Sequence, residues 1–389
     1  MIALSQQLRN MRVLRKFLVL SLFVCIVQSC RENIEVAKEE TEQVGTIEHT
    51  SVKGFYLLNE GNMGSNKSTL DYYDFTTATY HRNIYPTANP DVVKELGDVG
   101  NDLQAYGSRL YAVINASNKV EVMDRSTGKR IGQVDIPNCR YIRFHEGYAY
   151  VTSYAGPIEI TENYKQKGYV ARFDTATLQI DGRCVVGYQP DELEIVGEKI
   201  YVANSGGYMV PNYENTVSVI DLRTFTETHR IEVAINLHHI RADRHGQLWV
   251  SSRGDYYSHP SKLYVIDPQT DQLKDSVLIS VSNLCISGDS IYTCSTEFSY
   301  TDMSDAVVYG IVDTRTHKVV SSNFLAADNS QKIKKPYGIW VNPATGDIFL
   351  TDAKEYVTPG TLYCFSATGE LRWSVRTGDI PAHFCPIGK

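Results

Sequence analysis

The chain has 389 residues, of which 21% are charged, 42% are hydrophobic and 13 are proline, and this composition excludes disordered, collagen-like and membrane-channel proteins. The formal net charge is −7, but four basic residues precede Cys30, and from Cys30 onward 34 Lys and Arg face 45 Asp and Glu, a net charge of −11. So acidic a protein repels phosphate backbones, which excludes nucleic acid as a partner. Tyrosine is unusually abundant, with 26 residues against 12 phenylalanines and 3 tryptophans.

The N-terminal residues have the pattern of an export signal. Three basic residues, ending at Lys16, precede an apolar run over residues 17–27, which is shorter than the roughly 20 residues of a membrane-spanning helix. The run ends at Val27-Gln28-Ser29-Cys30, which resembles a bacterial lipobox with Cys30 as the lipidated residue. We therefore expect residues 1–29 to be a lipoprotein signal peptide. The alternative is a conventional signal, after which Cys30 has no role.

Residues 30–53 follow as an acidic, polar segment with six glutamates and few large apolar side chains. A segment of this kind is expected to be a flexible tether that spans roughly 25 Å. Acidic residues just after a lipidated cysteine resemble the surface-export signal of Bacteroidetes lipoproteins, and several acyl chains on one cysteine hold a protein firmly to a membrane. The expected location is therefore the outer membrane, with a lipid anchor and exposure at the cell surface.

From residue 54 onward the sequence repeats one strand pattern seven times. Each unit contains an aromatic-centred strand and then a Val/Ile-rich strand that closes on a polar residue, at intervals of 46 to 53 residues: Asp74, Asp124, Asp174, Asp221, Asp267, Asp313 and Ser366. This period is typical of one four-stranded blade, so residues 54–389 predict an all-β, seven-bladed β-propeller. In the clearest copy we expect strands A to D over residues 191–196, 199–204, 215–221 and 227–233. The closing Asp is expected to accept hydrogen bonds within the C–D turn, not to be catalytic.

The two ends of the repeat are out of phase, which predicts how the ring closes. The repeat begins at a strand B, residues 54–58, and ends at a strand A, residues 380–385, so the C-terminal strand is expected to pair with the N-terminal blade. Such closure removes exposed sheet edges. One helix is expected over residues 90–96, with Asn89 as its N-cap and Gly97 after its end.

No nucleotide-binding, hydrolase or zincin motif occurs in the sequence. Cys285 and Cys294 flank a turn, and buried free thiols are favoured over a disulfide between them. His238, His239 and His383 lie near the starts of strands A, where they bind a metal or form a polar lining of the central channel. A propeller lactonase is expected to bind Ca²⁺ or Mg²⁺ through oxygen ligands. Candidate ligands of this kind end three strands B: Glu60, Asn204 and Asp352.

The B–C and D–A connections of a propeller lie on one face, and here they are long and rich in Tyr, Asn, Ser, Gly and Arg. That composition is typical of binding loops, in which aromatic planes supply contact area and small polar residues adapt to the ligand. The alternative is that long loops are simply polar and tolerate tyrosine. We expect a ligand-binding site, without a catalytic residue or a resident metal, formed by Asn59, Glu60, Asn62, Asn101, Asn115, Arg140, Tyr154, Gln189, Asn204, Tyr208, His239, Arg253, Tyr256, Phe298, Tyr300, Tyr337, Tyr356 and His383.

Two resemblances add to this interpretation. The segments 110–115 and 200–204 resemble the YncE-like seven-bladed propellers, and the segments 54–74 and 95–115 resemble the BtuG-type surface lipoproteins of Bacteroidetes. The second resemblance implies a protein that captures cobalamin, as a transported ligand and not a cofactor, and passes it to a TonB-dependent outer-membrane transporter. It identifies no individual ligand residue. The alternatives are a metal-dependent propeller lactonase and an adhesion or glycan-binding propeller.

Overall fold

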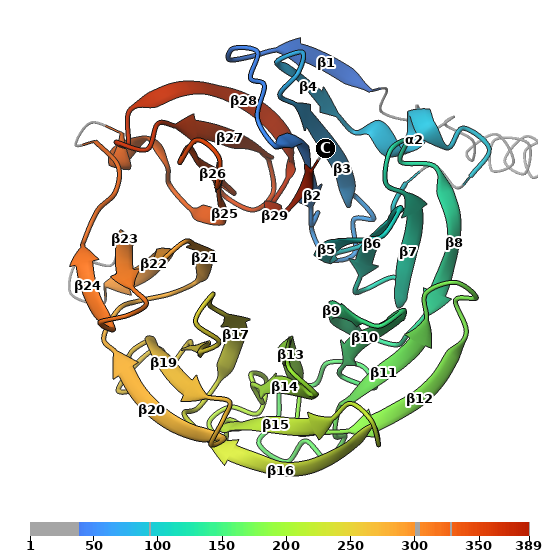
Figure 1. Cartoon of the computed structure of the whole chain (residues 1–389), viewed down its shortest axis with the longest axis vertical. Coiled ribbons are helices and arrows are strands. Elements are labelled where there is room, and N and C mark those ends of the chain that lie inside the picture. The colour runs from blue at the N-terminus through green and yellow to red at the C-terminus, as the bar shows by residue number, and fades with distance from the viewer. Residues whose placement is uncertain (1–38, 93–94, 300–303, 327–328, 389) are drawn as a thin grey trace, which may run out of the picture. The chain divides into compact units, whose positions relative to one another are not determined.

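The computed structural model describes residues 39–92, 95–299, 304–326 and 329–388. Seven antiparallel sheets surround a central opening (Figure 1). Six contain four strands that are consecutive in the sequence, and the seventh joins the C-terminal strand to the first strands of the chain. The predicted seven-bladed β-propeller is thereby confirmed. In the clearest copy, the four strands lie within one residue of their predicted bounds. Among the described residues, no helix is of a length and apolarity that would let it cross a membrane.

The strands of each blade run from the channel outward in the order A to D. Blade 1 contains β29 (Pro381–Gly388), β2 (Val52–Asn59), β3 (Thr69–Asp74) and β4 (Thr79–Arg82), with β1 (Glu40–Gln43) added outside β4. Blade 2 contains β5 (Gly100–Tyr106), β6 (Arg109–Ile114), β7 (Lys119–Asp124) and β8 (Arg130–Asp135). Blade 3 contains β9 (Cys139–His145), β10 (Tyr148–Ser153), β11 (Tyr169–Asp174) and β12 (Ile180–Val185). Blade 4 contains β13 (Pro190–Val196), β14 (Lys199–Asn204), β15 (Thr216–Asp221) and β16 (Thr226–Glu232).

The remaining blades follow the same order. Blade 5 contains β17 (Leu237–Ala242), β18 (Leu248–Ser252), β19 (Lys262–Asp267) and β20 (Gln272–Val277). Blade 6 contains β21 (Asn283–Ser287), β22 (Ser290–Ser299), β23 (Ser304–Asp313) and β24 (Lys318–Ser321). Blade 7 contains β25 (Pro336–Val341), β26 (Ile348–Asp352), β27 (Pro359–Phe365) and β28 (Leu371–Asp379). Short helices α2 (Ile84–Ala88) and η1 (Ser330–Lys332) lie in connections.

The core lies between the faces of neighbouring blades. Strand B is buried on both of its faces, as in β6, β10 and β14, whereas the outer strands β8 and β12 alternate between exposed and partly buried positions. One hydrophobic cluster joins Tyr111 of blade 2 to Val151 of blade 3, and another joins Tyr201 of blade 4 to Val250 of blade 5. Because each face is covered by the next blade, the blades cannot bury their apolar side chains alone.

Blade 1 is closed by β29, which pairs antiparallel with β2 and places Leu57 opposite Phe384. The Thr351 hydroxyl of blade 7 donates a hydrogen bond to the Pro381 carbonyl across 2.6 Å, which ties the last blade to the closing strand. The predicted closure of the ring by the C-terminal strand is confirmed. β29 thereby pairs with the edge of β2 that would otherwise lie open at the channel.

The closing Asp of each repeat acts in the C–D turn, as predicted. Asp124 Oδ1 accepts hydrogen bonds from the backbone N–H groups of Ser126 and Thr127, at 3.1 and 3.0 Å. In the seventh copy Ser366 Oγ takes over this role by accepting the N–H of Thr368 at 3.3 Å. A hydroxyl can replace the carboxylate because the turn needs only a side-chain acceptor two residues before the N–H group.

Several tyrosines of strand B join adjacent blades. The Tyr56 hydroxyl donates to the Arg125 carbonyl at 2.7 Å, and the Tyr201 hydroxyl donates to Asp271 Oδ1 at 2.6 Å. Both acceptors belong to the C–D turn of the next blade. Part of the tyrosine excess is therefore structural, because a buried phenol supplies both apolar area and a hydroxyl for this turn.

The structure differs from the sequence predictions at two places near the N-terminus. Residues 39–53 of the predicted tether pack on blade 1: Thr41 of β1 pairs with His81 of β4, and the Tyr73 hydroxyl donates to the Val44 carbonyl at 3.0 Å. The composition misleads here because glutamates of this segment contact side chains of β4, as Glu40 does in its ion pair with Arg82. Residues 1–38, including Cys30 and the residues expected to form the signal peptide, lie outside the described residues.

The second difference is the helix, which precedes Asn89; of the predicted range 90–96, residues 90–92 and 95–96 are described and are not helical. Helix α2 ends at Ala88, and Asn89 is its C-cap. The Asn89 amide donates to the carbonyls of Tyr85 and Gly128, both at 3.0 Å, and its oxygen accepts the N–H of Arg130 at 2.7 Å. These bonds fasten the helix to the C–D turn of blade 2, so the side chain that could cap a following helix is already engaged.

The disulfide left open by the sequence is absent among the described cysteines, all six of which are free and buried. Cys285 lies opposite Tyr292, and Cys294 lies opposite Asn283, so the two thiols are not cross-strand partners. Burial raises the pKa of the Cys139 and Cys294 thiols to about 12. At neutral pH these thiols are protonated and pack as small apolar groups.

Candidate ligand-binding cavity

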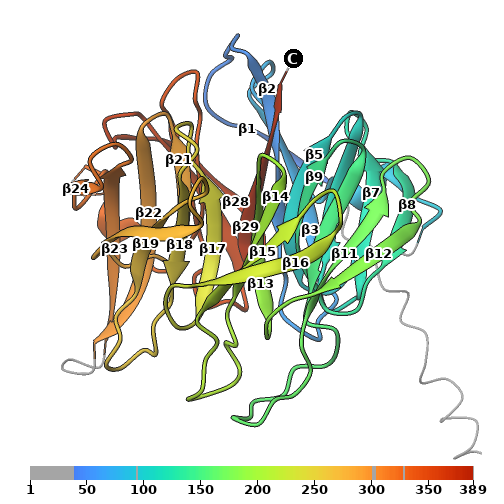
Figure 2. The same cartoon turned by 60° about the horizontal axis from the view of Figure 1, so that its bottom comes forward.

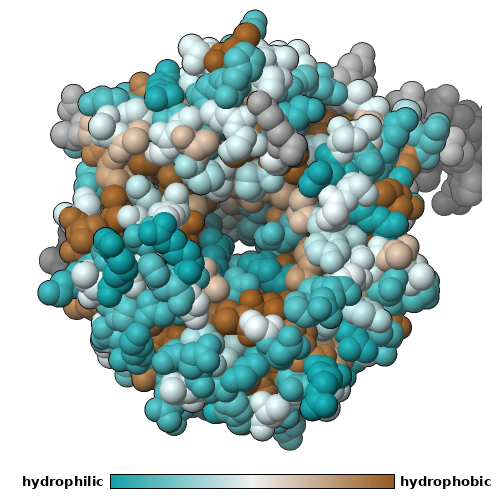
Figure 3. All heavy atoms as spheres, in the orientation of Figure 1, coloured by the Kyte–Doolittle hydropathy of each residue, from teal (hydrophilic) through white to brown (hydrophobic). Residues whose placement is uncertain are grey.

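A cavity of about 940 Å³ lies where the B–C and D–A connections meet, at one end of the central channel. Every one of the seven blades contributes to its lining, from Glu60 of blade 1 to Tyr337 of blade 7. Long connections extend from the lower side of the ring in Figure 2. Figure 3 shows the hollow at the centre of the ring, with hydrophilic residues around much of it. The predicted site face therefore contains a large concave surface.

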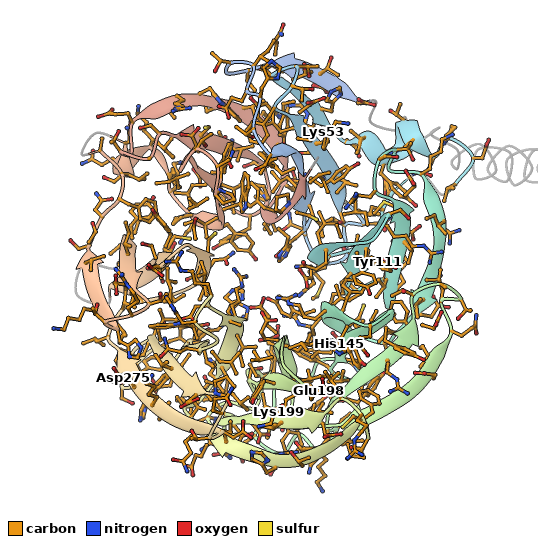
Figure 4. All side chains as sticks on the ribbon, viewed as in Figure 1. Lys53, Tyr111, His145, Glu198, Lys199 and Asp275 are labelled. Carbon is orange, nitrogen blue, oxygen red and sulfur yellow. The ribbon has the colours of Figure 1, made fainter. Side chains whose placement is uncertain are left out.

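β-Bulges recur at the starts of strands A, where several residues of the cavity lining lie. The register between strands A and B shifts at residues 140–141 in blade 3, at 191–192 in blade 4, at 238–239 in blade 5 and at 337–338 in blade 7. A bulge adds a residue that opposes no partner and re-aims the side chains beside it. Figure 4 shows nitrogen- and oxygen-bearing side chains around the central opening.

The cavity brings together ten of the residues that the sequence proposed. They come from all blades except blade 6 and share a position at a strand end or in an adjacent connection: Glu60, Asn101, Asn115, Arg140, Tyr208, His239, Arg253, Tyr256, Tyr337 and His383.

Other proposed residues lie beneath or beside the cavity. Asn59, Tyr154, Gln189 and Asn204 are buried and hydrogen-bonded within the protein. The Asn204 amide, for example, donates to Ser218 at 2.8 Å and accepts from the Gly187 N–H at 3.1 Å, and a Cβ at Gly187 would lie 2.4 Å from it. These side chains hold the loops in place and are not in the cavity lining.

The last four proposed residues are placed differently. Asn62 lies in the B–C turn of blade 1, where its carbonyl accepts the N–H of Ser65 at 3.0 Å. Tyr356 is 39% exposed and packs edge-on against the Tyr337 ring, with centroids 6.0 Å apart. Phe298 belongs to β22, but its side chain and the whole of Tyr300 lie outside the described residues.

The sequence prediction missed several lining residues. They include Tyr141, Ser282 and Asn283 at the starts of strands A, and Met63, Val210, Tyr213 and Tyr257 in B–C loops. Tyr141 could have been predicted from its position next to Arg140, because both residues lie in the same β-bulge. The apolar rim residues carry no such signal, because a single exposed methionine or valine in a loop is common.

One wall of the cavity is formed by blades 3, 4 and 5 around the buried carboxylate of Asp191. Arg140 Nε donates to Asp191 Oδ1 and Arg253 Nη1 donates to Asp191 Oδ2, each at 3.1 Å. The Tyr154 hydroxyl donates to Oδ1 at 2.8 Å, and the Arg140 guanidinium lies 4.9 Å from the centre of the Tyr154 ring. Three segments distant in sequence thus meet at one carboxylate.

A second carboxylate, Glu192, organises the channel beside that wall. Its Oε1 accepts hydrogen bonds from Arg143 and, at 3.1 Å, from Arg241 Nε, while its Oε2 lies 2.7 Å from His239 Nδ1. Arg241, His239 and Arg143 hold the pKa of this carboxyl well below its ordinary value although burial opposes them. Glu192 is therefore ionised, and its charge is needed to keep the surrounding cations in place.

His238 is stacked on His239, with ring centroids 3.7 Å apart, and its Nε2 lies 3.0 Å from the Tyr141 hydroxyl. Burial, and then the charge of Arg253, drive the pKa of His238 well below its ordinary value, so the ring is neutral. Its buried Nδ1 has no hydrogen-bond partner within the described structure. The His238 ring lines the cavity, but its Nδ1 atom is itself buried and is not exposed to a ligand.

The opposite wall lies at the junction of blades 7 and 1 and carries an anion. Glu60 Oε2 accepts the Tyr337 hydroxyl at 2.9 Å, and Glu60 Oε1 lies 3.1 Å from His383 Nε2. Blade 4 lies across the ring from this junction (Figure 1). The cavity is thus polarised, with arginines on one wall and a carboxylate on the other.

The rim of the cavity is apolar and exposed. Tyr256 and Tyr257 of blade 5 are 62% and 83% exposed, and Met63 and Val210 of the neighbouring lining are 66% and 48% exposed. Exposed large hydrophobic side chains grouped around a concave surface are typical of a binding site. The cavity therefore combines an apolar rim with a polar, hydrogen-bonding interior.

The residues expected of a lactonase do not meet in the cavity. Of the three, Glu60 lies in the lining, whereas Asn204 is engaged as above and Asp352 accepts the backbone N–H groups of Lys334, Lys335 and Lys354. In the described part of the chain, no group of three or more His, Cys, Asp or Glu is arranged to hold a metal ion.

Comparisons with known proteins agree on the architecture. A family described as a domain of unknown function, DUF5074, matches residues 53–379. No curated protein matches the sequence. Among solved structures, hydrazine synthase of Kuenenia stuttgartiensis is similar with a TM-score of 0.59 and 16% identity, over 74% of this chain and 89% of that one.

Two further structures have the same architecture. A quinoprotein alcohol dehydrogenase-like protein of Bacteroides thetaiotaomicron has a TM-score of 0.55 and 13% identity, over 86% of this chain and 78% of that one. The dihydro-heme d1 dehydrogenase NirN, in complex with DHE, has a TM-score of 0.52 and 10% identity, over 90% of this chain and 80% of that one. At these identities the likeness extends to the fold alone.

Proposed function

The chain belongs to the DUF5074 family, and we propose that it is a non-catalytic surface lipoprotein that binds cobalamin in the cavity and delivers it to a TonB-dependent outer-membrane transporter. One observation carries the binding proposal: a cavity of about 940 Å³ whose exposed aromatic and apolar rim surrounds amides, histidines and arginines. Pockets for small ligands span roughly 300–1,000 Å³, so this cavity suits a ligand at the large end of that range.

The chemistry of a corrinoid matches this surface. Its macrocycle is a broad apolar plate, which suits the exposed rings of Tyr256 and Tyr257. Its edge carries neutral amides, which can exchange hydrogen bonds with side chains such as Asn101 and Asn283 in the lining. The identity of the ligand and the delivery step come from the resemblance to the BtuG-type lipoproteins, and the anchor comes from the lipobox at Cys30.

Titration calorimetry of the whole chain, purified in detergent, with cyanocobalamin tests the proposal. We expect saturable binding of one ligand, and we expect the double replacement Tyr256→Ala and Tyr257→Ala to weaken it by about 10-fold or more, because base or ring stacking on one aromatic side chain contributes roughly 1–3 kcal/mol. Leu278→Ala removes a side chain that is 71% exposed and lies outside the cavity lining, and this control should bind as the wild type does.

The absence of both heat and a thermal shift would refute the proposal. Binding to a glycan array by a protein that ignores cobalamin would instead support the adhesion alternative. Hydrolysis of a lactone that requires a divalent cation and is lost in Glu60→Ala would support the lactonase alternative.

A further inference from the structure

The wall formed by blades 3, 4 and 5 contains more positive charge than its own carboxylate can offset. Arg140 and Arg253 both lie in the cavity lining, whereas Asp191, which pairs with both, is fully buried behind them. The two guanidinium groups have ten N–H donors between them. Asp191 Oδ1 already accepts hydrogen bonds from Arg140 and Tyr154, so the carboxylate cannot satisfy the rest.

No other lining carboxylate is directed at these arginines. Asp255 follows Arg253 closely in sequence, but its oxygens accept hydrogen bonds from the N–H groups of Tyr257, Ser258 and His259, at 2.8 to 2.9 Å, and from two side chains of the same loop. Glu60 is engaged with Tyr337 and His383 at the junction of blades 7 and 1. One unit of positive charge at Arg140 and Arg253 is therefore left for a ligand.

Neighbouring groups on this wall are suited to bind oxygen atoms of an anion. Tyr208 also lines the cavity, and its ring lies 6.5 Å from the Tyr154 ring that the Arg140 guanidinium covers. Arginine binds phosphate and carboxylate through paired N–H donors, and such charge-assisted bonds are stronger than neutral ones. The wall thus has both the charge and the donors of an anion site.

We propose that Arg140 and Arg253 form a subsite for a single anionic group of the ligand, which in cobalamin is the phosphodiester of the nucleotide loop. This inference rests on the proposed function and adds the orientation of the ligand. The phosphodiester lies against blades 3 to 5, and the amide edge of the macrocycle faces Glu60, Tyr337 and His383, where a carboxylate and a histidine bond to neutral amide N–H and C=O groups.

The test compares cyanocobalamin with dicyanocobinamide, which lacks the phosphodiester and the nucleotide base. Both ligands are titrated into the wild-type chain, Arg253→Gln and Arg253→Lys. Arg253 is the residue to change because Asp191 keeps Arg140 and Tyr154 as partners without it. In Arg253→Gln, cobalamin should bind about 10- to 100-fold more weakly, while cobinamide binding should change little.

Arg253→Lys keeps the positive charge, so it should bind cobalamin more tightly than Arg253→Gln and less tightly than the wild type. A rise in ionic strength should weaken cobalamin binding to the wild type more than binding to Arg253→Gln. Arg172→Gln is the matched control, because Arg172 pairs with Asp181 at 2.8 Å on blade 3 and lies outside the cavity lining. Equal losses for the two ligands in Arg253→Gln overturn the anion subsite and leave cobalamin binding in place. Absence of binding by either ligand to the wild type overturns both proposals.

Discussion

Replacing Glu192 with glutamine removes the charge that holds three cationic or basic side chains together at the channel. Glu192 is 1% exposed and accepts hydrogen bonds from Arg143, from Arg241 and from His239. Glutamine has nearly the same shape, but its NH₂ group would face N–H donors where a carboxylate oxygen now accepts them. The substitution therefore tests the charge and the acceptor together, with little change in packing volume.

The cost can be worked from the burial of this network. Breaking a buried ion pair by removing one partner costs about 3–5 kcal/mol, because it leaves an uncompensated charge away from water. A unit of this size gains entropy of unfolding of about 0.7 kcal/mol per kelvin near its midpoint. We therefore expect Glu192→Gln to lower the Tm by about 4–7 °C.

Urea unfolding followed by circular dichroism, together with thermal melting, measures both quantities. Glu370→Gln changes an exposed carboxylate of the C–D turn of blade 7, and as a control it should shift the free energy of unfolding by less than about 0.5 kcal/mol. A Glu192→Gln protein that unfolds within about 1 kcal/mol of the wild type would show that the network does not depend on this charge.

Three further predictions concern pH, the joints between blades and the anchor. Folding lowers the pKa of Glu192 from its ordinary value of 4.5, so the contribution of its charge to stability is present above pH 4.5 and is lost as the pH falls through the folded pKa. In acid titrations the wild type should therefore lose more stability than Glu192→Gln between about pH 5 and pH 2. Parallel curves for the two proteins would contradict this prediction. Tyr201→Phe removes the hydroxyl that donates to Asp271 at 2.6 Å and should cost about 1–2 kcal/mol in urea unfolding, whereas Tyr309→Phe, which removes a buried hydroxyl without a partner in the described structure, should be neutral or stabilising. Cys30→Ala should move the protein from the membrane fraction to the soluble fraction, and retention in the membrane would exclude the lipid anchor.

The repeat made the fold predictable, because each blade must place strands of the same length and pattern beside the next. The Asp or Ser at the end of strand C is a local turn signal, and Asp124 and Ser366 fill this role as predicted. The sequence predicted the helix on the wrong side of Asn89, because the position of this helix depends on contacts with a distant segment. Asn89 is a good cap in the sequence, but its amide is bonded to Gly128 and Arg130 of the next blade, which a local pattern does not include.

The candidate site was predictable as a face and only partly as a set of residues. The loops on which the sequence placed Asn204 and Tyr208 lie together, yet Tyr208 lines the cavity and Asn204 is fully buried. Both residue types suit a binding loop, so composition cannot separate them. Their roles differ because Asn204 bonds to Ser218 of its own blade and to Gly187 of the preceding connection, and those contacts depend on how the folded strands are placed.

By itself the sequence determined the number of blades, the closure of the ring and the face that carries the long loops, because these follow from a repeat period and from its phase at the two ends. Only the tertiary structure decided which side chains meet. Arg140, Asp191 and Arg253 lie on three different blades and come together because bulges at the starts of β9 and β13 turn side chains toward a shared axis. A repeat specifies each blade separately, whereas the cavity is formed where all seven blades face one another.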